Sequence, residues 1–313
     1  MTLFLQNIQT AAQQVLILYV IVAVGFIADR LHVFTEKTAR ASNDLMFYVV
    51  TPCVIVHSFL GTEFSKDTAK GFAVALGCSF LAHFIGILAA APFFNKKDDP
   101  NSAVYKFASV YGNVGYMALP LANAVLGAQG VFYCSGGVIA LNTIAFTHGI
   151  WLMNKGKNVK FELKSLVLNP GVISVIIGLP LFLFSVRLPA ILNEPIGFIS
   201  DLNTPLAMLI FGTYISNTDL KSLFKDRNQY LVMMIRLVTV PLIMLGVCKL
   251  LSLPSALTTA CMISAAAPSA NNTVMFSAKY GKDTGLASKV VALNSFMSVI
   301  TLPIMIAISQ ISA

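Results

Sequence analysis

Long apolar stretches alternate with short polar ones along the whole chain. About ten of them reach roughly 18 to 25 residues, long enough for a helix to cross a bilayer core of about 30 Å. We therefore predict an all-α polytopic membrane protein with about ten transmembrane helices. The predicted spans are Ala11–Ala28, Asp44–Leu60, Gly71–Phe94, Ala103–Leu126, Val131–Met153, Leu166–Val186, Pro195–Ser216, Tyr230–Leu251, Ala256–Ala278 and Leu286–Ile311.

Two of these spans, the fourth and the ninth, contain interruptions with Pro and Asn, and the interruption in the fourth span also contains Gly. The first break covers residues 112–120 and the second covers residues 265–272. An interrupted backbone within a bilayer must be satisfied by protein, water or a ligand. Paired breaks in corresponding parts of a chain are typical of the binding sites of secondary transporters. We therefore interpret the chain as a transporter.

The two halves of the chain resemble each other in the order of their landmarks. Gly25 and Pro52 recur 153 residues later, and the segment 138–143 resembles 290–295 at an offset of 152. Because each half holds five spans, the second would enter the membrane upside down. We predict a 5+5 inverted repeat with crossed broken helices four and nine. Its parts are residues 1–153, a cytoplasmic linker at 154–165, and residues 166–313.

The residue types at the breaks favour an anionic ligand. A proline suits the first turn of a helix, so we expect Pro120 and Pro268 to open new half-helices. Free amides at helix N-termini carry partial positive charge and can hold an anion without a buried Lys or Arg. Carboxamides add further donors. The predicted substrate-binding residues are Asn113, Gly115, Pro120, Asn123, Pro268, Ser269, Asn271 and Asn272.

Composition and charge support the membrane assignment. The chain is 57% hydrophobic and 11% charged, which excludes an ordinary soluble surface. Its net charge of +8 comes from basic residues scattered over short loops, so we predict no nucleic-acid partner. Sixteen basic residues fall in loops after odd-numbered spans and four in the even loops. This bias places the odd loops in the cytoplasm and both termini outside the cell membrane, and we expect no cleaved leader.

The cysteines and four further polar residues are candidates for packing, coupling or support. The five cysteines lack the close spacing of a metal or redox motif, so we expect packing roles, no metal and no cofactor. Asp44 and Asp201, near the ends of spans two and seven, could relay protons or offset helix dipoles. Asn142 and Asn294, matched across the repeat, could bind sodium or support the crossover, and support is favoured. Proton coupling, sodium coupling and uniport therefore all stay open.

Several of these residues resemble a known family. Asn113 seven residues before Pro120, together with Pro268 leading into the segment 274–281, looks like the auxin efflux carrier family, whose bacterial members include malate and malonate carriers. The resemblance covers nearly the whole chain, although Thr273 replaces a second proline and the long central loop of the plant members is missing.

The resemblance implies a specific architecture and mechanism. The fold would be similar to bile-acid sodium symporters and sodium/proton antiporters. Spans 1, 2, 6 and 7 would form a scaffold that can dimerise, and spans 3–5 and 8–10 a transport domain that moves as an elevator. Asn113 would bind the substrate carboxylate.

We therefore predict a secondary transporter of a small mono- or dicarboxylate, such as malate or malonate, and not an enzyme. A sodium-coupled symporter of a larger amphipathic anion and a non-transporting anion sensor remain alternatives. Cation exchange is disfavoured because Val131–Met153 contains no acid. An intramembrane protease using Asp44 and Asp201 is disfavoured because no supporting motif is present. The sequence leaves the anion, the direction, the coupling ion and the oligomeric state open.

Overall fold

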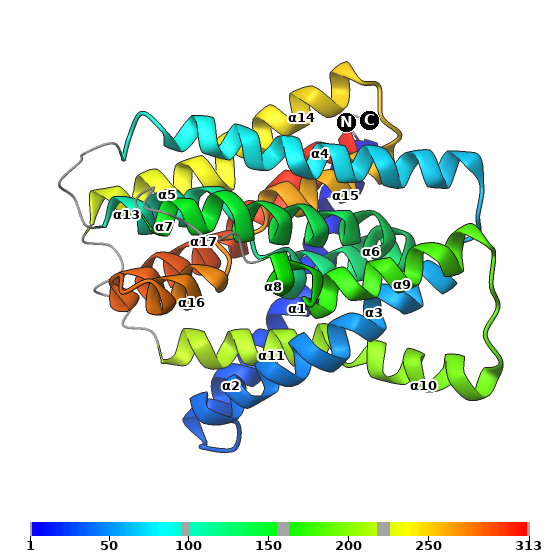
Figure 1. Ribbon diagram of the computed structural model, residues 1–313, viewed down its shortest axis with the longest axis horizontal. Coiled ribbons are helices and arrows are strands. Elements are labelled where there is room, and N and C mark those ends of the chain that lie inside the picture. Colours follow the sequence, from blue (N-terminus) through cyan, green and yellow to red (C-terminus); the bar gives the residue numbers. More distant parts are fainter. Residues whose placement is uncertain (1, 95–100, 155–162, 218–225, 312–313) are drawn as a thin grey trace.

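The computed structural model describes residues 2–94, 101–154, 163–217 and 226–311, and Figure 1 shows them as a helical bundle. These residues form no strand, apart from an isolated bridge between Gly112 and Ser269. The helices are α1 (Thr2–Arg30), α2 (Glu36–Leu45), α3 (Thr51–Leu60), α4 (Lys66–Ala90), α5 (Ser102–Val110), α6 (Leu119–Ile144), α7 (Ile150–Met153), α8 (Leu163–Val167), α9 (Pro170–Leu183), α10 (Ala190–Asp201), α11 (Asn203–Ser216), α13 (Arg227–Met233), α14 (Val240–Leu250), α15 (Ser255–Ala266), α16 (Asn272–Lys279) and α17 (Thr284–Ile311).

Six helical segments of the described residues are long and apolar enough to cross a membrane. Two shorter apolar helices, α9 and α15, accompany them. The predicted class of an all-helical membrane protein is therefore confirmed, whereas the count of ten spans and the inverted repeat stay predictions. The six segments are Glu36–Leu60, Lys66–Ala90, Val114–Met153, Ala190–Ser216, Arg227–Leu250 and Thr284–Gln310.

Three prolines are accommodated in the apolar helices by π-helical turns placed just before them. A proline lacks an amide hydrogen, and its ring crowds the carbonyl of the preceding turn. In each case the amide of the residue before the proline donates to the carbonyl five residues back, so the widened turn restores a hydrogen bond that an apolar environment requires. These bonds run from Thr51 to Met46, from Leu119 to Val114, and from Val240 to Ile235.

Helices α1 and α11 touch backbone to backbone. A Cβ atom added at Gly25 would lie 2.3 Å from the carbonyl oxygen of Leu209, and one added at Gly212 would lie 2.1 Å from that of Val22. Only glycine permits this approach, which is how small residues bring membrane helices together. The landmark Gly25 is thus a packing residue.

Gly178, the predicted counterpart of Gly25, has the same kind of role on α9. A Cβ atom there would lie 2.8 Å from the ring of Phe59 on α3. Phe59 also packs edge to face on Phe132 of α6, with ring centroids 4.9 Å apart. Gly25 therefore packs predicted span 1 on predicted span 7, and Gly178 packs predicted span 6 on predicted span 2.

The fourth and fifth predicted spans meet at a sharp turn within α6. Gly127 has φ 63° and ψ −153°, a conformation that favours glycine. The two arms then run so close that a Cβ atom at Gly130 would lie 2.5 Å from the carbonyl oxygen of Ala122. This turn falls between the predicted ends Leu126 and Val131. Of the predicted linker 154–165, residues 155–162 lie outside the described part of the chain.

Candidate functional site

The two sequence breaks lie side by side and bond to each other through their backbones. Asn113 N donates to the carbonyl of Pro268 over 2.7 Å, and Ala270 N donates to the carbonyl of Tyr111 over 2.8 Å. Gly112 and Ser269 form an antiparallel bridge between them. The peptide groups that each helix loses are thus satisfied by the other break, which is what a buried interruption demands. We call residues 111–113 and 267–271 the crossover.

A side chain adds to this pairing. Ser269 is fully buried, and its hydroxyl donates to the carbonyl of Ala108 on α5 over 2.7 Å. Ser269 is therefore a structural link between the second break and α5, and its hydroxyl proton is used within the protein. The sequence had placed it among the substrate-binding residues.

Arg236 holds the ends of the two helices that enter the crossover. It lies in the π-helical turn Met234–Thr239 and is 2% exposed. Carbonyl groups at a helix C-terminus carry partial negative charge, which a cation offsets. The guanidinium donates to one carbonyl at the end of α5 and two near the end of α15. These bonds go from Nε to Ala267 over 2.7 Å, from Nη1 to Val110 over 3.2 Å, and from Nη2 to Ser264 over 3.4 Å.

The positive charge of Arg236 is balanced by these carbonyl dipoles rather than by an acid. The one ion pair within the described residues joins Arg40 to Glu36. The sequence analysis expected the helix N-termini to hold an anion without a buried Lys or Arg, and it did not foresee that Arg236 bonds to the helix ends beside the breaks. Arg236 was assigned only to a span, because nothing in its local sequence indicates that it reaches residues 31 and 126 positions away.

The first break restarts as a helix earlier than predicted. The helical turn begins at Val114, after Asn113, whose side-chain oxygen accepts from Tyr116 N over 3.3 Å as an N-cap. Pro120 therefore lies six residues inside the half-helix and does not open it. Its position after a π-helical turn explains how the helix tolerates it.

The second break also differs from the prediction. Pro268 lies within the non-helical part of the crossover, and helix α16 begins four residues later at Asn272. Asn271 occupies the N-cap position of α16 without a side-chain cap hydrogen bond. Its carboxamide is therefore available to a ligand.

A cavity of about 520 Å³ lies against the crossover. Asn113 and Asn271, one from each break, both line it, together with Tyr116 and Met117. This volume is within the range of small-molecule sites. Because the Asn113 oxygen accepts from the backbone, its NH₂ group is the part that can donate to a ligand.

The opposite wall of the cavity comes from α2 and α11. Its lining residues there are Glu36, Arg40, Asn43, Ala207, Ile210, Phe211, Tyr214, Ile215 and Asn217. Helices α16 and α17 complete it with Val274, Met275, Ser288, Val291, Ala292, Ser295 and Phe296. The cavity is therefore mostly apolar, with carboxamides at the crossover and charged groups on α2, the combination typical of a ligand site.

Arg40 is a site residue that the sequence analysis missed. It was counted only as a loop cation, yet it lines the cavity and pairs with Glu36 over 2.5 Å. Both side chains are well exposed, at 73% and 45%, so the pair itself contributes little stability. A guanidinium that can exchange a carboxylate of the protein for one of a ligand suits anion capture.

The remaining predicted binding residues lie outside the cavity lining. Gly115 is half-buried with open space where a Cβ would be, and Asn123 is exposed on α6. Asn272 is half-buried at the start of α16. Pro120, Pro268 and Ser269 are buried.

The two acidic coupling candidates are exposed and do not line the cavity. Asp44 lies in α2, which begins eight residues earlier than the predicted span. Asp201 is the last residue of α10, and α11 begins two residues later at Asn203, so Asp201 lies where the two helices meet.

Asn142 and Asn294 are both buried, and each makes the same kind of local hydrogen bond. Each donates its carboxamide to the carbonyl four residues back, over 2.8 Å for Asn142 and 3.0 Å for Asn294. The Asn142 oxygen also accepts from Asn169 over 3.0 Å, at the start of α9. Asn142 therefore has a supporting contact, whereas the buried oxygen of Asn294 has no hydrogen-bond partner in the described structure.

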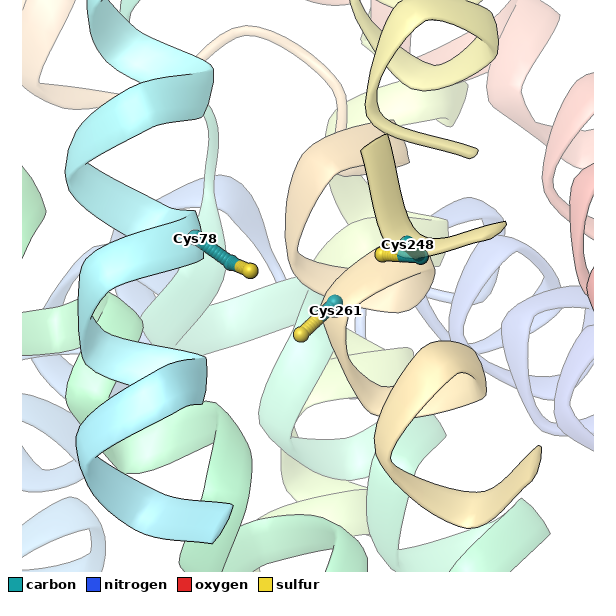
Figure 2. A group of neighbouring side chains, drawn as sticks. All are labelled: Cys78, Cys248 and Cys261. Atoms are coloured by element: carbon teal, nitrogen blue, oxygen red, sulfur yellow. The ribbon is translucent and has the colours of Figure 1, made fainter. Parts of the chain in front are cut away.

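Three of the cysteines lie close together in the structure although they are far apart in the sequence. Cys78, Cys248 and Cys261, from α4, α14 and α15, have their sulfur atoms within 4.8 Å of one another (Figure 2). Cys53 and Cys134 are not part of this group.

Comparison with known proteins places the chain in a family of membrane transport proteins. The profile of a family described as "Membrane transport protein" matches residues 10–306. The chain is 23% identical over 298 residues to "Uncharacterized transporter MJ1031" of Methanocaldococcus jannaschii, covering 92% of this chain and 95% of that protein. It is also 23% identical over 315 residues to "Uncharacterized transporter YfdV" of Escherichia coli K12, covering 93% of this chain and 95% of that protein.

Proposed function

This chain belongs to the membrane transport protein family, and from that premise we propose that it carries a small organic anion across the cell membrane. The observation that carries the proposal is the cavity at the crossover, which Asn113 and Asn271 both line. Donors from two breaks that face one cavity can hold a carboxylate from two sides. Arg40 on the opposite wall adds a cation for a second carboxylate or for steering.

The walls of the cavity support a mechanism of alternating access. One wall comes from α2 and α11, which lie in the proposed scaffold, and the other from the crossover, α16 and α17, which lie in the proposed transport domain. A site between two bodies changes its exposure when one moves against the other. The backbone contacts of α1 with α11 would keep the scaffold rigid, and a homodimer through this scaffold remains part of the proposal.

We also propose that the structure corresponds to an inward-facing state, in which the cavity opens toward the cytoplasm. Glu36, Arg40 and Asn217 adjoin the first and seventh loops, which the basic residues predict to be cytoplasmic. Both termini are then extracytoplasmic. For coupling, protons or sodium remain candidates, and the exposed positions of Asp44 and Asp201 do not favour either acid as a buried relay.

Counterflow in proteoliposomes tests the function without assuming a driving ion. Purified protein would be loaded with unlabelled malate or malonate, and entry of the labelled acid would be followed. We expect exchange by wild type and at least about a tenfold loss in Asn113→Ala, because a charge-assisted hydrogen bond contributes about 1.5–3 kcal/mol. Asn193→Ala is the matched control, since Asn193 lies on α10 and outside the cavity lining.

The outcomes separate the alternatives. Exchange by Asn113→Ala as fast as by wild type would contradict the proposed site, as would an equal loss in Asn113→Ala and Asn193→Ala. Saturable malate binding to folded protein without any exchange would indicate a sensor. Exchange of a larger amphipathic anion that requires sodium, with none of malate or malonate, would indicate the sodium-coupled alternative.

A further inference from the structure

Three cysteines from separate helices converge in the bundle. Cys78 lies in the middle of α4, Cys248 near the end of α14, and Cys261 in the middle of α15. Their sulfur atoms all lie within 4.8 Å of one another, and Figure 2 shows the three side chains directed into the same space between the helices. The residues are separated by 170 and 13 positions, so no spacing motif reveals the group. We call these residues the thiol cluster.

The thiol cluster is shielded from solvent. Cys78 is 5% exposed, Cys248 is fully buried and Cys261 is 4% exposed. Ordinary packing would account for one buried cysteine, because a thiol behaves as a small apolar group. Three convergent thiols also form a preorganised set of soft donors. Within the described residues no His, Asp or Glu joins them as a further ligand.

We propose that the thiol cluster is a binding site for a monovalent soft metal ion, with copper(I) as the ion that fits best. Thiolates select copper(I) and zinc over harder ions. Structural zinc requires four ligands, and only three are present. Each thiol that binds as a thiolate releases one proton to solvent, and no electron is transferred.

The spacing of the sulfur atoms suits this ion. Metal–thiolate bonds of about 2.3 Å in a trigonal arrangement place the sulfurs roughly 4 Å apart. The observed limit of 4.8 Å therefore needs a contraction of less than about 1 Å, which side-chain torsions can supply. No movement of the helix backbones is required.

The position of the thiol cluster also indicates what the metal would do. Helices α4, α14 and α15 all belong to the proposed transport domain, and α15 leads into the second break five residues after Cys261. A metal bound there would join three helices of one body without linking that body to α1 or α11. We therefore expect the metal to raise the unfolding temperature and to leave exchange across the membrane intact.

The test uses the full-length protein, purified, reduced and titrated anaerobically with copper(I) against a chromogenic copper(I) chelator. The double variant Cys53→Ser/Cys134→Ser provides the matched control, because it removes both cysteines outside the thiol cluster. We expect one copper(I) per chain in wild type and in this control, with sulfur-to-copper charge-transfer absorption. Cys78→Ser, Cys248→Ser and Cys261→Ser should each weaken binding by more than about 100-fold, the upper end of what loss of an outer-shell partner costs.

Three results would contradict the proposed copper site. Wild type that retains no copper(I) against the chelator would overturn the site, as would equal binding by wild type and Cys261→Ser. Loss of binding in the control double variant would place the copper elsewhere. Thermal unfolding of each metal-free variant shows whether it is folded, and because there are three independent single substitutions, the test survives if one variant does not fold.

Discussion

The two breaks are alike in sequence but differ in what each leaves for a ligand. At the first break Asn113 is 6% exposed, caps the following half-helix and donates its backbone amide to the second break. At the second break Asn271 is half-buried and makes no side-chain cap bond. One asparagine therefore combines structural and binding groups, whereas the other offers its whole carboxamide to the cavity.

This difference between the breaks shows how an interrupted helix can be stable without a ligand and still bind one through its side chains. The backbone groups of both breaks are satisfied by each other and by Arg236, so the crossover does not need a ligand to fold. Only the side chains that face the cavity remain for substrate. Substitutions can therefore distinguish the groups that hold the crossover together, Gly112 and Arg236, from the side chains that would bind substrate. We call the first set the frame of the crossover.

The largest effect is expected from Arg236→Met, which removes the frame. Three carbonyls at two helix ends would lose their donors in a buried region, at a cost of about 1–3 kcal/mol for each group left unsatisfied. We expect unfolding free energy to fall by about 3–5 kcal/mol, the range found when one partner of a buried charged network is lost. Denaturant unfolding in detergent would measure it.

Arg227→Met is the control for this substitution, because Arg227 is exposed at the start of α13. It should change stability by less than about 0.5 kcal/mol. Equal stability of the Arg236→Met protein and wild type would show that the crossover holds without the guanidinium.

A smaller loss of stability is expected from Gly112→Ala, because the added methyl group would collide with Arg236. The new Cβ would lie 2.0 Å from Nη2 of Arg236, so the guanidinium must shift from its carbonyls. Such overpacking costs about 1–3 kcal/mol. In the same break, an added Cβ at Gly115 meets nothing within 4 Å. Gly115→Ala should therefore be close to neutral, and a larger loss in Gly115→Ala than in Gly112→Ala would contradict this arrangement.

The smallest effects on stability separate the two asparagines. Asn113→Ala removes an N-cap and should lower unfolding free energy by about 1 kcal/mol. Asn271→Ala removes no cap bond and should leave stability within about 0.5 kcal/mol of wild type. Both should weaken binding of malate or malonate, measured by calorimetry. Identical stability losses for the two variants would remove the distinction between the breaks.

Part of the candidate site could be predicted from sequence because its signals are local. Gly, Pro and Asn within apolar segments mark places where a helix cannot continue, and both breaks are found where the sequence placed them. The exact helix starts were wrong, because capping by Asn113 and the π-helical turn before Pro120 depend on hydrogen bonds among neighbouring turns. Asn123 and Ser269 show the same limit, since the direction of a side chain follows from packing.

The sequence by itself determined that this is a helical membrane protein with two interrupted helices. Apolar length and the missing amide of proline act on each segment independently of the rest of the chain. Only the tertiary structure decided that Arg236 closes the crossover, that Arg40 faces the cavity, and that three cysteines from α4, α14 and α15 meet. Those contacts join residues far apart in the chain, so they exist only once the helices have packed and fixed which faces meet.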